Sequence, residues 1–377
     1  MDVAEAEVMR KAWLINMQQN QLMKNTAVYT LLFAVCALVI IFYYCVNEVE
    51  IVMEDSQEDI VQSTDTAIRE NSDDKPENIQ SENSIIFEKN DQEMTYFCVP
   101  LHEDVRAENV TIENHYMDKE LWISIDKEQN SKKFDDFYHA HGVYGNRDAV
   151  VEGYFENSED AFRLKFKLAD IYEYHSIFEN NNLYIEFVSP KEVYDKIVVI
   201  DPAYGGEIAG AVSGKLEGKK ITLEIARALK EKLDETDIKV YYTRMDDSAP
   251  SDDNRIYLTN AVKADMLIRI EVSEDEDTKK YGTEAVYNSK FFIPGFGSVE
   301  LADLLEKEVV TAISGKANGL LASTAEDEVI EKAVVPAAAI RVGYVSNGQE
   351  AILLNREDYI QKIADGIYQA ILLAYEE

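Results

Sequence analysis

Histidine is the side chain that most often binds transition metals and exchanges protons near neutral pH, and in this chain of 377 residues it occurs only in the first half. The five histidines are His102, His115, His139, His141 and His175. His139 and His141 have the spacing of a metal-binding pair on one face of a strand. Two ligands without a nearby third do not form a typical metal site. Any chemistry in residues 176–377 must therefore proceed without an imidazole.

The second half of the chain carries a series of short motifs. In chain order they are IVVIDPAYGG at 197–206, TLEIARAL at 222–229, Thr243-Arg244, Arg255, Asn260, Ala264-Asp265, Gly282 with Glu284, Pro336 and GYVSN at 343–347. In this order and at this spacing, the motifs resemble those of the zinc-dependent N-acetylmuramoyl-L-alanine amidases. These hydrolases cut the bond between the glycan and the stem peptide of bacterial peptidoglycan. The resemblance extends from about residue 197 to the last residue.

The resemblance implies a site built around one zinc ion. In the family, zinc is held by a histidine after an IDPG strand, a glutamate before the first helix, and a histidine that ends a strand such as ADLFISIH. Three protein ligands leave one position for water, and the metal lowers the pKa of that water while it polarises the amide carbonyl. A second glutamate, beside a turn near the C-terminus, transfers the proton.

All four of these functional positions carry a different residue here. The first histidine corresponds to Tyr204, the glutamate ligand to Gly218, the second histidine to Glu271 and the catalytic glutamate to Arg341. Gly218 has no side chain to donate, and Tyr204 has a reference pKa of about 10 and rarely serves as a neutral ligand. Arg341 offers no lone pair and stays protonated. A slip of one residue would bring in Glu217, but still no imidazole. We therefore predict a degenerate site with no metal, no cofactor and no catalytic residue.

Glu271 and Arg341 carry opposite charges and should end neighbouring elements that face one pocket. An arginine and a carboxylate form bidentate hydrogen bonds, so the pair would keep the former site structured without metal. Alternatively, Arg341 could recognise the carboxylate of a stem peptide. Both substitutions could also reflect drift at a site that is no longer used.

Residues 26–46, TAVYTLLFAVCALVIIFYYCV, form an apolar run without a charged side chain. About 20 apolar residues cross a bilayer as a helix, and this run is longer than the apolar core of a cleaved signal peptide. Arg10, Lys11 and Lys24 precede the run, whereas acidic residues follow it from Glu48 onward. The positive-inside rule then places the N-terminus in the cytoplasm and the rest of the chain outside.

The composition predicts five segments. They are a cytoplasmic tail (1–25), a transmembrane helix (26–46), an acidic disordered linker (47–93), a small β-rich extracellular domain (94–196) and an amidase-like domain (197–377). The linker has too few apolar residues to offset the entropy of ordering the chain. The motif FRLKFKL in the β-rich segment alternates as a half-buried strand does. By position alone, this segment is similar to the β-sandwich module that precedes the catalytic domain in many secreted amidases.

Strand and helix patterns alternate along the amidase-like segment. Strands are predicted at 197–200, 240–242, 266–270 and 338–342, and helices at 219–233, 254–263, 301–309 and 360–371. This alternation predicts an α/β fold, a layered mixed or parallel sheet with helices on both faces.

Acidic residues dominate the composition, with 72 Asp and Glu against 37 Lys and Arg and a formal net charge of −35. Such a charge disfavours binding to nucleic acid and to anionic polymers. We interpret the chain as a membrane-anchored amidase-like protein of the bacterial envelope, catalytically inactive, that binds peptidoglycan or another envelope protein. Two alternatives stay open: an active N-acetylmuramoyl-L-alanine amidase with displaced ligands, and a purely structural ectodomain that contacts another envelope protein.

Overall fold

The computed structural model describes residues 84–88, 95–126, 131–158 and 160–376. The predicted cytoplasmic tail and transmembrane helix, and nearly all of the predicted linker, lie outside these residues. Within the described ranges, no helix has both the length and the apolar character that crossing a bilayer requires.

A six-stranded sheet organises the C-terminal region, in the order β13-β10-β14-β17-β15-β16. Its strands are β10 (Ile197–Pro202), β13 (Lys239–Tyr242), β14 (Met266–Ser273), β15 (Thr283–Tyr287), β16 (Ala317–Ala322) and β17 (Ala337–Tyr344). All neighbouring pairs are parallel except β15 with β17, which is antiparallel. Every residue of β10 is buried, and its first four side chains are apolar. This is typical of a strand that is covered on both faces of a parallel sheet.

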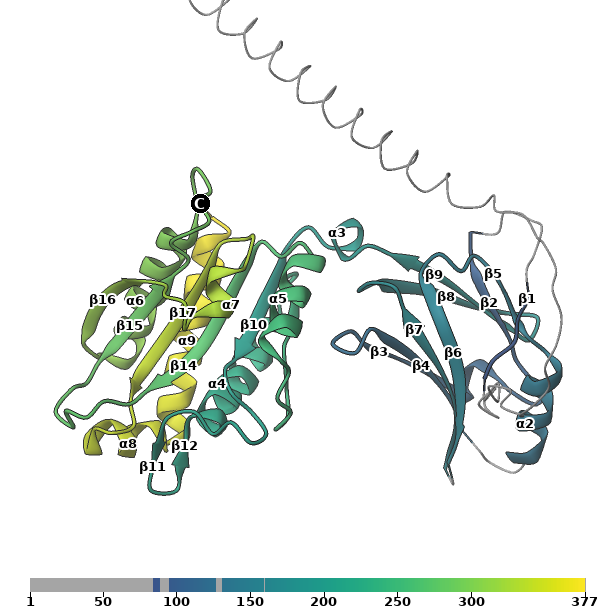
Figure 1. The fold of residues 1–377 in the computed structure, drawn as a ribbon, viewed down its shortest axis with the longest axis horizontal. Helices are drawn as coiled ribbons and strands as arrows, with labels where there is room; N and C mark the ends of the chain where they lie inside the picture. Colours follow the sequence, from purple (N-terminus) through teal and green to yellow (C-terminus); the bar gives the residue numbers. More distant parts are fainter. Residues whose placement is uncertain (1–83, 89–94, 127–130, 159, 377) are drawn as a thin grey trace, which may run out of the picture. The chain divides into compact units, whose positions relative to one another are not determined.

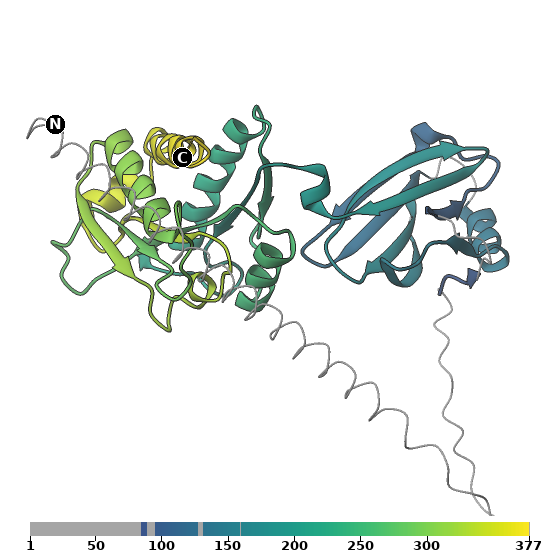
Figure 2. The same cartoon turned by 90° about the horizontal axis from the view of Figure 1, so that it is seen from above.

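Helices cover both faces of this sheet (Figures 1 and 2). On one face lie α4 (Gly218–Leu233), α6 (Ser298–Ile313) and α9 (Glu357–Ala374), and on the other lie α5 (Asp252–Ala261) and α7 (Glu328–Glu331). Ile200 packs into the first apolar cluster and Val199 into the second, since successive side chains of a strand point to opposite faces. The predicted mixed α/β sheet with helices on both faces is confirmed.

Two smaller elements flank the sheet. Strands β11 (Val212–Ser213) and β12 (Leu216–Glu217) form an antiparallel hairpin directly before α4. Helix α8 (Gly348–Leu354) packs against β17 and α9. Ala211, directly before the hairpin, holds the start of α4, because Gly218 N donates to Ala211 O at 2.8 Å.

The region before residue 190 forms two further sheets, in the orders β1-β5-β2-β9-β8 and β3-β4-β7-β6. Their strands are β1 (Phe87–Glu88), β2 (Phe97–Pro100), β3 (Val110–His115), β4 (Glu120–Asp126), β5 (Val143–Gly145), β6 (Val150–Asn157), β7 (Ala161–Leu168), β8 (Glu173–Glu179) and β9 (Asn182–Val188). Phe97 of one sheet and Phe166 of the other meet edge to face, 5.0 Å between ring centroids. The two sheets therefore share one apolar core.

Helical segments interrupt this β-rich region. They are η1 (Ala107–Asn109), α2 (Ser131–Ala140) and α3 (Pro190–Val193). His139 and His141 do not lie on a strand, because His139 lies in the last turn of α2 and His141 follows it. Each ring contacts a backbone carbonyl one turn earlier, His139 Nδ1 to Asp135 O at 2.7 Å and His141 Nδ1 to Phe137 O at 3.0 Å.

The β3–β4 turn contacts the edge of the six-stranded sheet. The hydroxyl of Tyr116 donates to Tyr242 O at 2.9 Å and accepts from Tyr242 N at 3.0 Å. Because β13 is an edge strand, this hydroxyl satisfies backbone groups that would otherwise be unpaired. Ile171 belongs to the same apolar cluster as Val199 and Tyr241. The described residues, from 84 to 376, accordingly group into one compact unit.

Candidate functional site

The fold brings together the four positions that the family resemblance identifies. Tyr204 follows β10, Gly218 opens α4, Glu271 lies near the end of β14 and Arg341 lies in β17. Carboxyl ends of parallel strands meet at one edge of a sheet, which is where α/β folds bind ligands. Tyr204, Glu271 and Arg341 line one open pocket of about 430 Å³ at this edge.

Glu271 and Arg341 stand directly opposite each other on β14 and β17. Arg341 Nε donates to Glu271 Oε2 at 3.1 Å, within the distance expected of a hydrogen bond. The prediction of a bidentate pair is wrong. The other oxygen of Glu271 accepts from Arg269 Nε at 2.7 Å instead of from Arg341. The Glu271 carboxylate therefore lies between two guanidinium groups.

The remaining nitrogens of Arg341 also face carboxylates. Nη1 lies 3.3 Å from Glu284 Oε1, and Nη2 lies 2.8 Å from Asp327 Oδ1. All three carboxylate side chains are about nine-tenths buried, with exposures of 9–12%. Burial alone would lower the pKa of Arg341, but Glu271, Asp327 and Glu284 together outweigh it and raise that pKa. This geometry favours a structural role for Arg341 over recognition of a ligand carboxylate.

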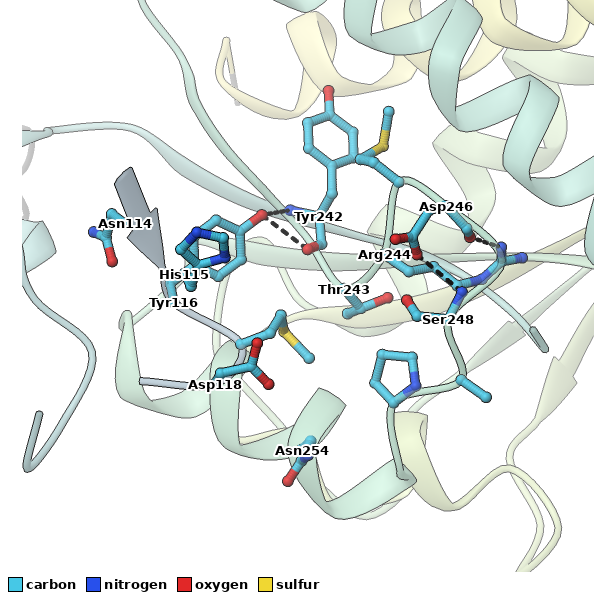
Figure 3. Close-up of a pocket in the computed structure, with 14 residues that line it drawn as sticks. Asn114, His115, Tyr116, Asp118, Tyr242, Thr243, Arg244, Asp246, Ser248 and Asn254 are labelled. Carbon is cyan, nitrogen blue, oxygen red and sulfur yellow. Dashed lines mark hydrogen bonds between the residues drawn. The ribbon is translucent and has the colours of Figure 1, made fainter. Parts of the chain in front are cut away.

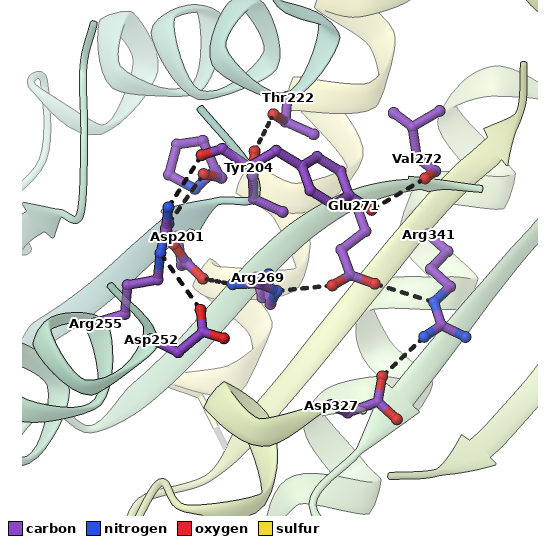
Figure 4. A network of polar contacts seen from close by, with 12 residues as sticks. Asp201, Tyr204, Thr222, Asp252, Arg255, Arg269, Glu271, Val272, Asp327 and Arg341 are labelled. Carbon is purple, nitrogen blue, oxygen red and sulfur yellow. Dashed lines mark hydrogen bonds and ion pairs between the residues drawn. The ribbon is translucent and has the colours of Figure 1, made fainter. Parts of the chain in front are cut away.

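A fully buried aspartate continues the network behind Glu271 (Figure 4). Asp201 accepts from Thr243 Oγ1 at 2.5 Å and is paired with Arg255 and Arg269. Burial would raise the pKa of Asp201, but Arg269 and Arg255 outweigh that effect and hold the pKa below its usual value. The contacts form a continuous chain of alternating charge from Asp201 through Arg269, Glu271 and Arg341 to Asp327.

Tyr204 occupies the position of the first family histidine in a left-handed backbone conformation, with φ of 69°. Its hydroxyl donates to Val272 O at 3.4 Å. Burial, with a smaller contribution from Glu271, raises the pKa of this hydroxyl to about 12, so it stays protonated at neutral pH. A Cβ atom on Gly218 would lie 3.3 Å from Tyr204 Cε2, and one on Gly210 would lie 2.4 Å from Tyr204 Cδ2. The tyrosine ring thus fills the space that a side chain at position 218 would enter.

These residues do not fit a zinc ion. Gly218 supplies no donor atom, Tyr204 is protonated, and a divalent cation beside Glu271 would meet the positive charges of Arg269 and Arg341. The neighbouring Glu217 pairs with a lysine, Lys220 Nζ, at 3.2 Å. Across the described ranges, no three His, Cys, Asp or Glu side chains are grouped so that they could hold a metal.

Arg244, within the Thr243-Arg244 motif, positions the backbone around the site. Its Nε donates to Pro202 O at 2.9 Å, and its Nη2 donates to Ala203 O at 2.9 Å and to Lys219 O at 2.8 Å. Burial, followed by the nearby charge of Arg255, lowers the pKa of Arg244 to about 10. The guanidinium therefore joins the segment that carries Tyr204 to the first turn of α4.

A second, larger pocket of about 580 Å³ lies next to Arg244 (Figure 3). It is lined by residues 114–118 of the β3–β4 turn and by residues of the β13–α5 segment, namely Tyr242, Thr243, Arg244, Met245, Asp246, Ser248, Ala249, Pro250 and Asn254. Tyr116 is bonded to the backbone of Tyr242, and Arg244 donates to Asp246 O at 2.8 Å. None of the four family positions lines this pocket.

The sequence analysis missed three members of the network, Arg269, Glu284 and Asp327. The sequence could have indicated that Arg269 belongs to the network, because it stands where the family strand ADLFISIH has a serine. Glu284 was noted only as part of a motif. Asp327 lies in the segment between β16 and α7, and nothing in its local sequence indicates that Arg341 binds it.

Comparisons with known proteins agree with the motifs. Residues 198–372 match the family model described as N-acetylmuramoyl-L-alanine amidase. The germination-specific N-acetylmuramoyl-L-alanine amidase of Bacillus subtilis (strain 168) is 29% identical over 216 residues, which cover 53% of this chain and 87% of that protein. The uncharacterized protein YqiI of the same strain is 29% identical over 182 residues, covering 48% of this chain and 86% of that protein.

Solved structures include the catalytic domain of CwlV, an N-acetylmuramoyl-L-alanine amidase from Bacillus (Paenibacillus) polymyxa var. colistinus. It is 27% identical to this chain in sequence and superposes with a TM-score of 0.45. The match covers 48% of this chain and 98% of that domain.

Proposed function

Because this chain belongs to the N-acetylmuramoyl-L-alanine amidase family through residues 198–372, we propose that it uses the amidase fold to bind peptidoglycan or an envelope protein without hydrolysis. The proposed protein is a regulatory or binding module of the bacterial envelope. It retains the framework of the fold, while the pocket at the carboxyl edge of the sheet holds a network of ion pairs.

The observation that carries this proposal is the environment of Glu271. Its two oxygens accept hydrogen bonds from Arg269 at 2.7 Å and from Arg341 at 3.1 Å. In the family, the equivalent position binds zinc, and the position of Arg341 carries the carboxylate that takes up a proton. An arginine there has no lone pair and cannot perform that step. No observation on the described residues favours the alternative of an active amidase with displaced ligands.

The proposed location is the outer face of a bacterial membrane. The apolar run at 26–46 and the positive residues before it support a single span with a cytoplasmic N-terminus. Residues 47–93 are acidic and would extend as a spacer, because like charges repel. The folded region would then reach the cell wall from the membrane.

Peptidoglycan is the first ligand to test, because relatives of similar sequence include a protein named N-acetylmuramoyl-L-alanine amidase, and N-acetylmuramoyl-L-alanine is a unit of peptidoglycan. A partner protein is the other candidate. The net charge of −35 makes nucleic acid an unsuitable ligand.

The test uses the full-length chain in detergent and purified peptidoglycan sacculi stripped of anionic wall polymers. We expect the chain to sediment with the sacculi, to release no stem peptide and to contain far less than one zinc per chain. Ser273, which lines the 430 Å³ pocket, is replaced by tryptophan to fill it. Val334, whose side chain is 54% exposed, receives the same change as a matched control.

Loss of sedimentation in Ser273→Trp but not in Val334→Trp would support binding through the pocket. Release of stem peptides would contradict the loss of hydrolysis. Absence of sedimentation with the wild-type chain would remove peptidoglycan as the ligand and leave a partner protein.

A further inference from the structure

The two edges of the six-stranded sheet differ. At one edge, β13 is capped by the hydroxyl of Tyr116, which bonds both backbone groups of Tyr242. At the other edge lies β16, which among the described strands pairs only with β15. Figures 1 and 2 show no described helix or strand beyond β16. An open edge presents unpaired N–H and C=O groups to any extended chain.

The sequence of β16 lacks the protection that edge strands usually carry. Proteins commonly place charged residues on open edges to prevent pairing with other chains. Among the edge strands of the three larger sheets, the other five, β1, β3, β6, β8 and β13, each contain at least one charged residue. The sequence of β16 is ANGLLA and contains none.

Part of β16 is already occupied by the chain itself, and this limits where a partner could pair. Gly319 has φ of 96° beside a register shift, and its N–H donates to Glu306 Oε1 at 2.6 Å. The remainder of the strand, Leu320 to Ala322, pairs regularly with β15 on one side. Its other side is the open part of the edge.

Exposed apolar side chains occur in this part of β16 and in the loop that follows β15. Leu321 is 41% exposed, and Phe292, at 85%, is the most exposed large apolar side chain among the described residues. Phe292 belongs to the loop that follows β15, and this loop is tied to the end of β16 because Ser289 N donates to Ser323 Oγ at 3.3 Å. A protein surface that exposes large apolar side chains beside unpaired backbone is typical of a binding site.

The charges near β16 indicate what kind of partner could bind there. Helix α6 packs against β16 and carries four acidic residues, Glu300, Asp303, Glu306 and Glu308, against one basic residue, Lys307. The whole chain has a net charge of −35, so a second copy would be repelled. A basic segment would be attracted.

We propose that β16 is a docking edge that binds an extended, basic and partly apolar segment of another envelope protein by adding it to the sheet. Strand addition draws its affinity from backbone hydrogen bonds and its specificity from alternate side chains. Leu321 and Phe292 would contact the apolar side chains of the segment, and the acidic residues of α6 would attract its basic ones. This interaction does not require the pocket of Tyr204 and Arg341, so it stands or falls independently of the proposed loss of hydrolysis.

The test measures binding of two labelled synthetic peptides to the full-length chain in detergent. One peptide alternates lysine and valine, and the other alternates lysine and proline. Both carry the same charge, but each proline lacks a backbone N–H and fixes φ near about −65°, so the proline peptide fits a strand ladder poorly. We expect the lysine–valine peptide to bind at least about tenfold more tightly. Its binding should also protect the amides of Leu320 and Ala322 from hydrogen exchange. Because Ser323 N donates to Tyr287 O of β15, the N–H of Leu321 also faces β15, whereas those of Leu320 and Ala322 face the open side.

Two matched variants locate the site. Leu321→Lys adds a charge to the open edge, whereas Ile352→Lys adds the same charge on α8, where Ile352 is 68% exposed. We expect about tenfold weaker binding for Leu321→Lys and unchanged binding for Ile352→Lys, with both variants melting like the wild type. Equal affinity for the two peptides, equal effects of the two variants, or no binding to the wild type would overturn the proposal. It would equally be overturned by a wild-type dimer in sedimentation that Leu321→Lys dissociates, since the occupant would then be a second copy.

Discussion

Among single residues, Tyr204 and Arg341 differ from the family pattern in different ways. Arg341 places a fixed positive charge among Glu271, Glu284 and Asp327. Tyr204 instead changes the available volume, because its ring lies where a side chain at position 218 would project. A metal could therefore bind only if both the positive charge of Arg341 and the ring of Tyr204 were removed. Restoring one family residue alone should only destabilise the fold.

Gly218→Glu restores the family ligand in this crowded space. The new Cβ would lie 3.2 Å from Ala211 N and 3.3 Å from Tyr204 Cε2. Overpacking of this kind costs about 1–3 kcal/mol, so urea denaturation should show a loss of that size. In the Tyr204→Ala background, the same change should cost clearly less. An equal cost in both backgrounds would show that the tyrosine ring does not occupy the space.

Arg341→Glu restores the catalytic carboxylate of the family. The change removes three ion pairs and places a fourth carboxylate beside three others, so we expect a loss of about 3–5 kcal/mol, the cost of breaking a buried pair. It should recover neither zinc binding nor hydrolysis, because the ligands would still be missing. Chemical denaturation and zinc content measure the two effects.

A double-variant cycle provides the control for the ion pair. Glu271→Ala combined with Arg341→Ala should cost less than the sum of the single changes, by at least about 0.5 kcal/mol. Additive losses would mean that the two side chains do not stabilise each other.

At the scale of elements, the buried part of the network joins three strands. Asp201 lies on β10, Arg269 on β14, and Thr243 directly after β13. Their mutual contacts fix the carboxyl ends of these strands and hence the positions of Tyr204 and Glu271. This arrangement depends on the ionised form of Asp201, which makes it sensitive to acid.

The pKa of Asp201 is lowered in the folded chain. Its ionisation therefore contributes stability that is fully present above the unfolded-state pKa of about 3.9, and that is lost as the pH falls through the lower folded-state pKa. In the Arg269→Gln variant the pKa of Asp201 is lowered less. The free energy of unfolding should therefore decrease less when the pH is lowered from about 6 to about 2. Arg356→Gln removes an exposed pair with Asp358 and serves as control. A steeper or unchanged pH dependence in Arg269→Gln would contradict this role for Asp201.

In the amidase-like region, strands β10, β13, β14 and β17 were predictable from sequence, whereas the buried strand β15 and the edge strand β16 were not. The apolar run IVVI in β10 and the repeat of Ile221 and Ile225 in α4 reflect burial, which leaves a periodic signal. Strand β16 is short and its side chains are mostly half-buried or exposed, so its pattern carried no such signal. The α2 helix was missed because the sequence was interpreted as β-rich throughout.

The network itself was predictable only where the family pattern gave a reference. Tyr204, Gly218, Glu271 and Arg341 were found because the family has a different residue at each position. Arg341 was assigned a single partner, whereas it contacts three carboxylates. The additional partners come from β15 and from the segment before α7, and the spacing of residues in a sequence does not indicate which loops fold over a strand end.

At the scale of the whole molecule, the proposed anchor decides where the folded region works. The run at 26–46 and its flanking charges favour a single span, with every later residue outside the cell. Protease added to intact, wall-stripped cells should then remove the folded region and leave a small membrane-retained fragment. Permeabilised cells provide the control. Complete protection of the folded region in intact cells would exclude this orientation.

We propose that this amidase-like fold binds its ligand without hydrolysis. The most direct measurement is mass spectrometry of stem peptides released from purified peptidoglycan by the full-length chain with added zinc, beside a catalytically competent amidase of the family. We predict release no higher than in the protein-free control, because Arg341 cannot accept a proton and Glu271 is held by two guanidinium groups. Release that rises with time and protein concentration, and that Glu271→Ala abolishes, would contradict the claim.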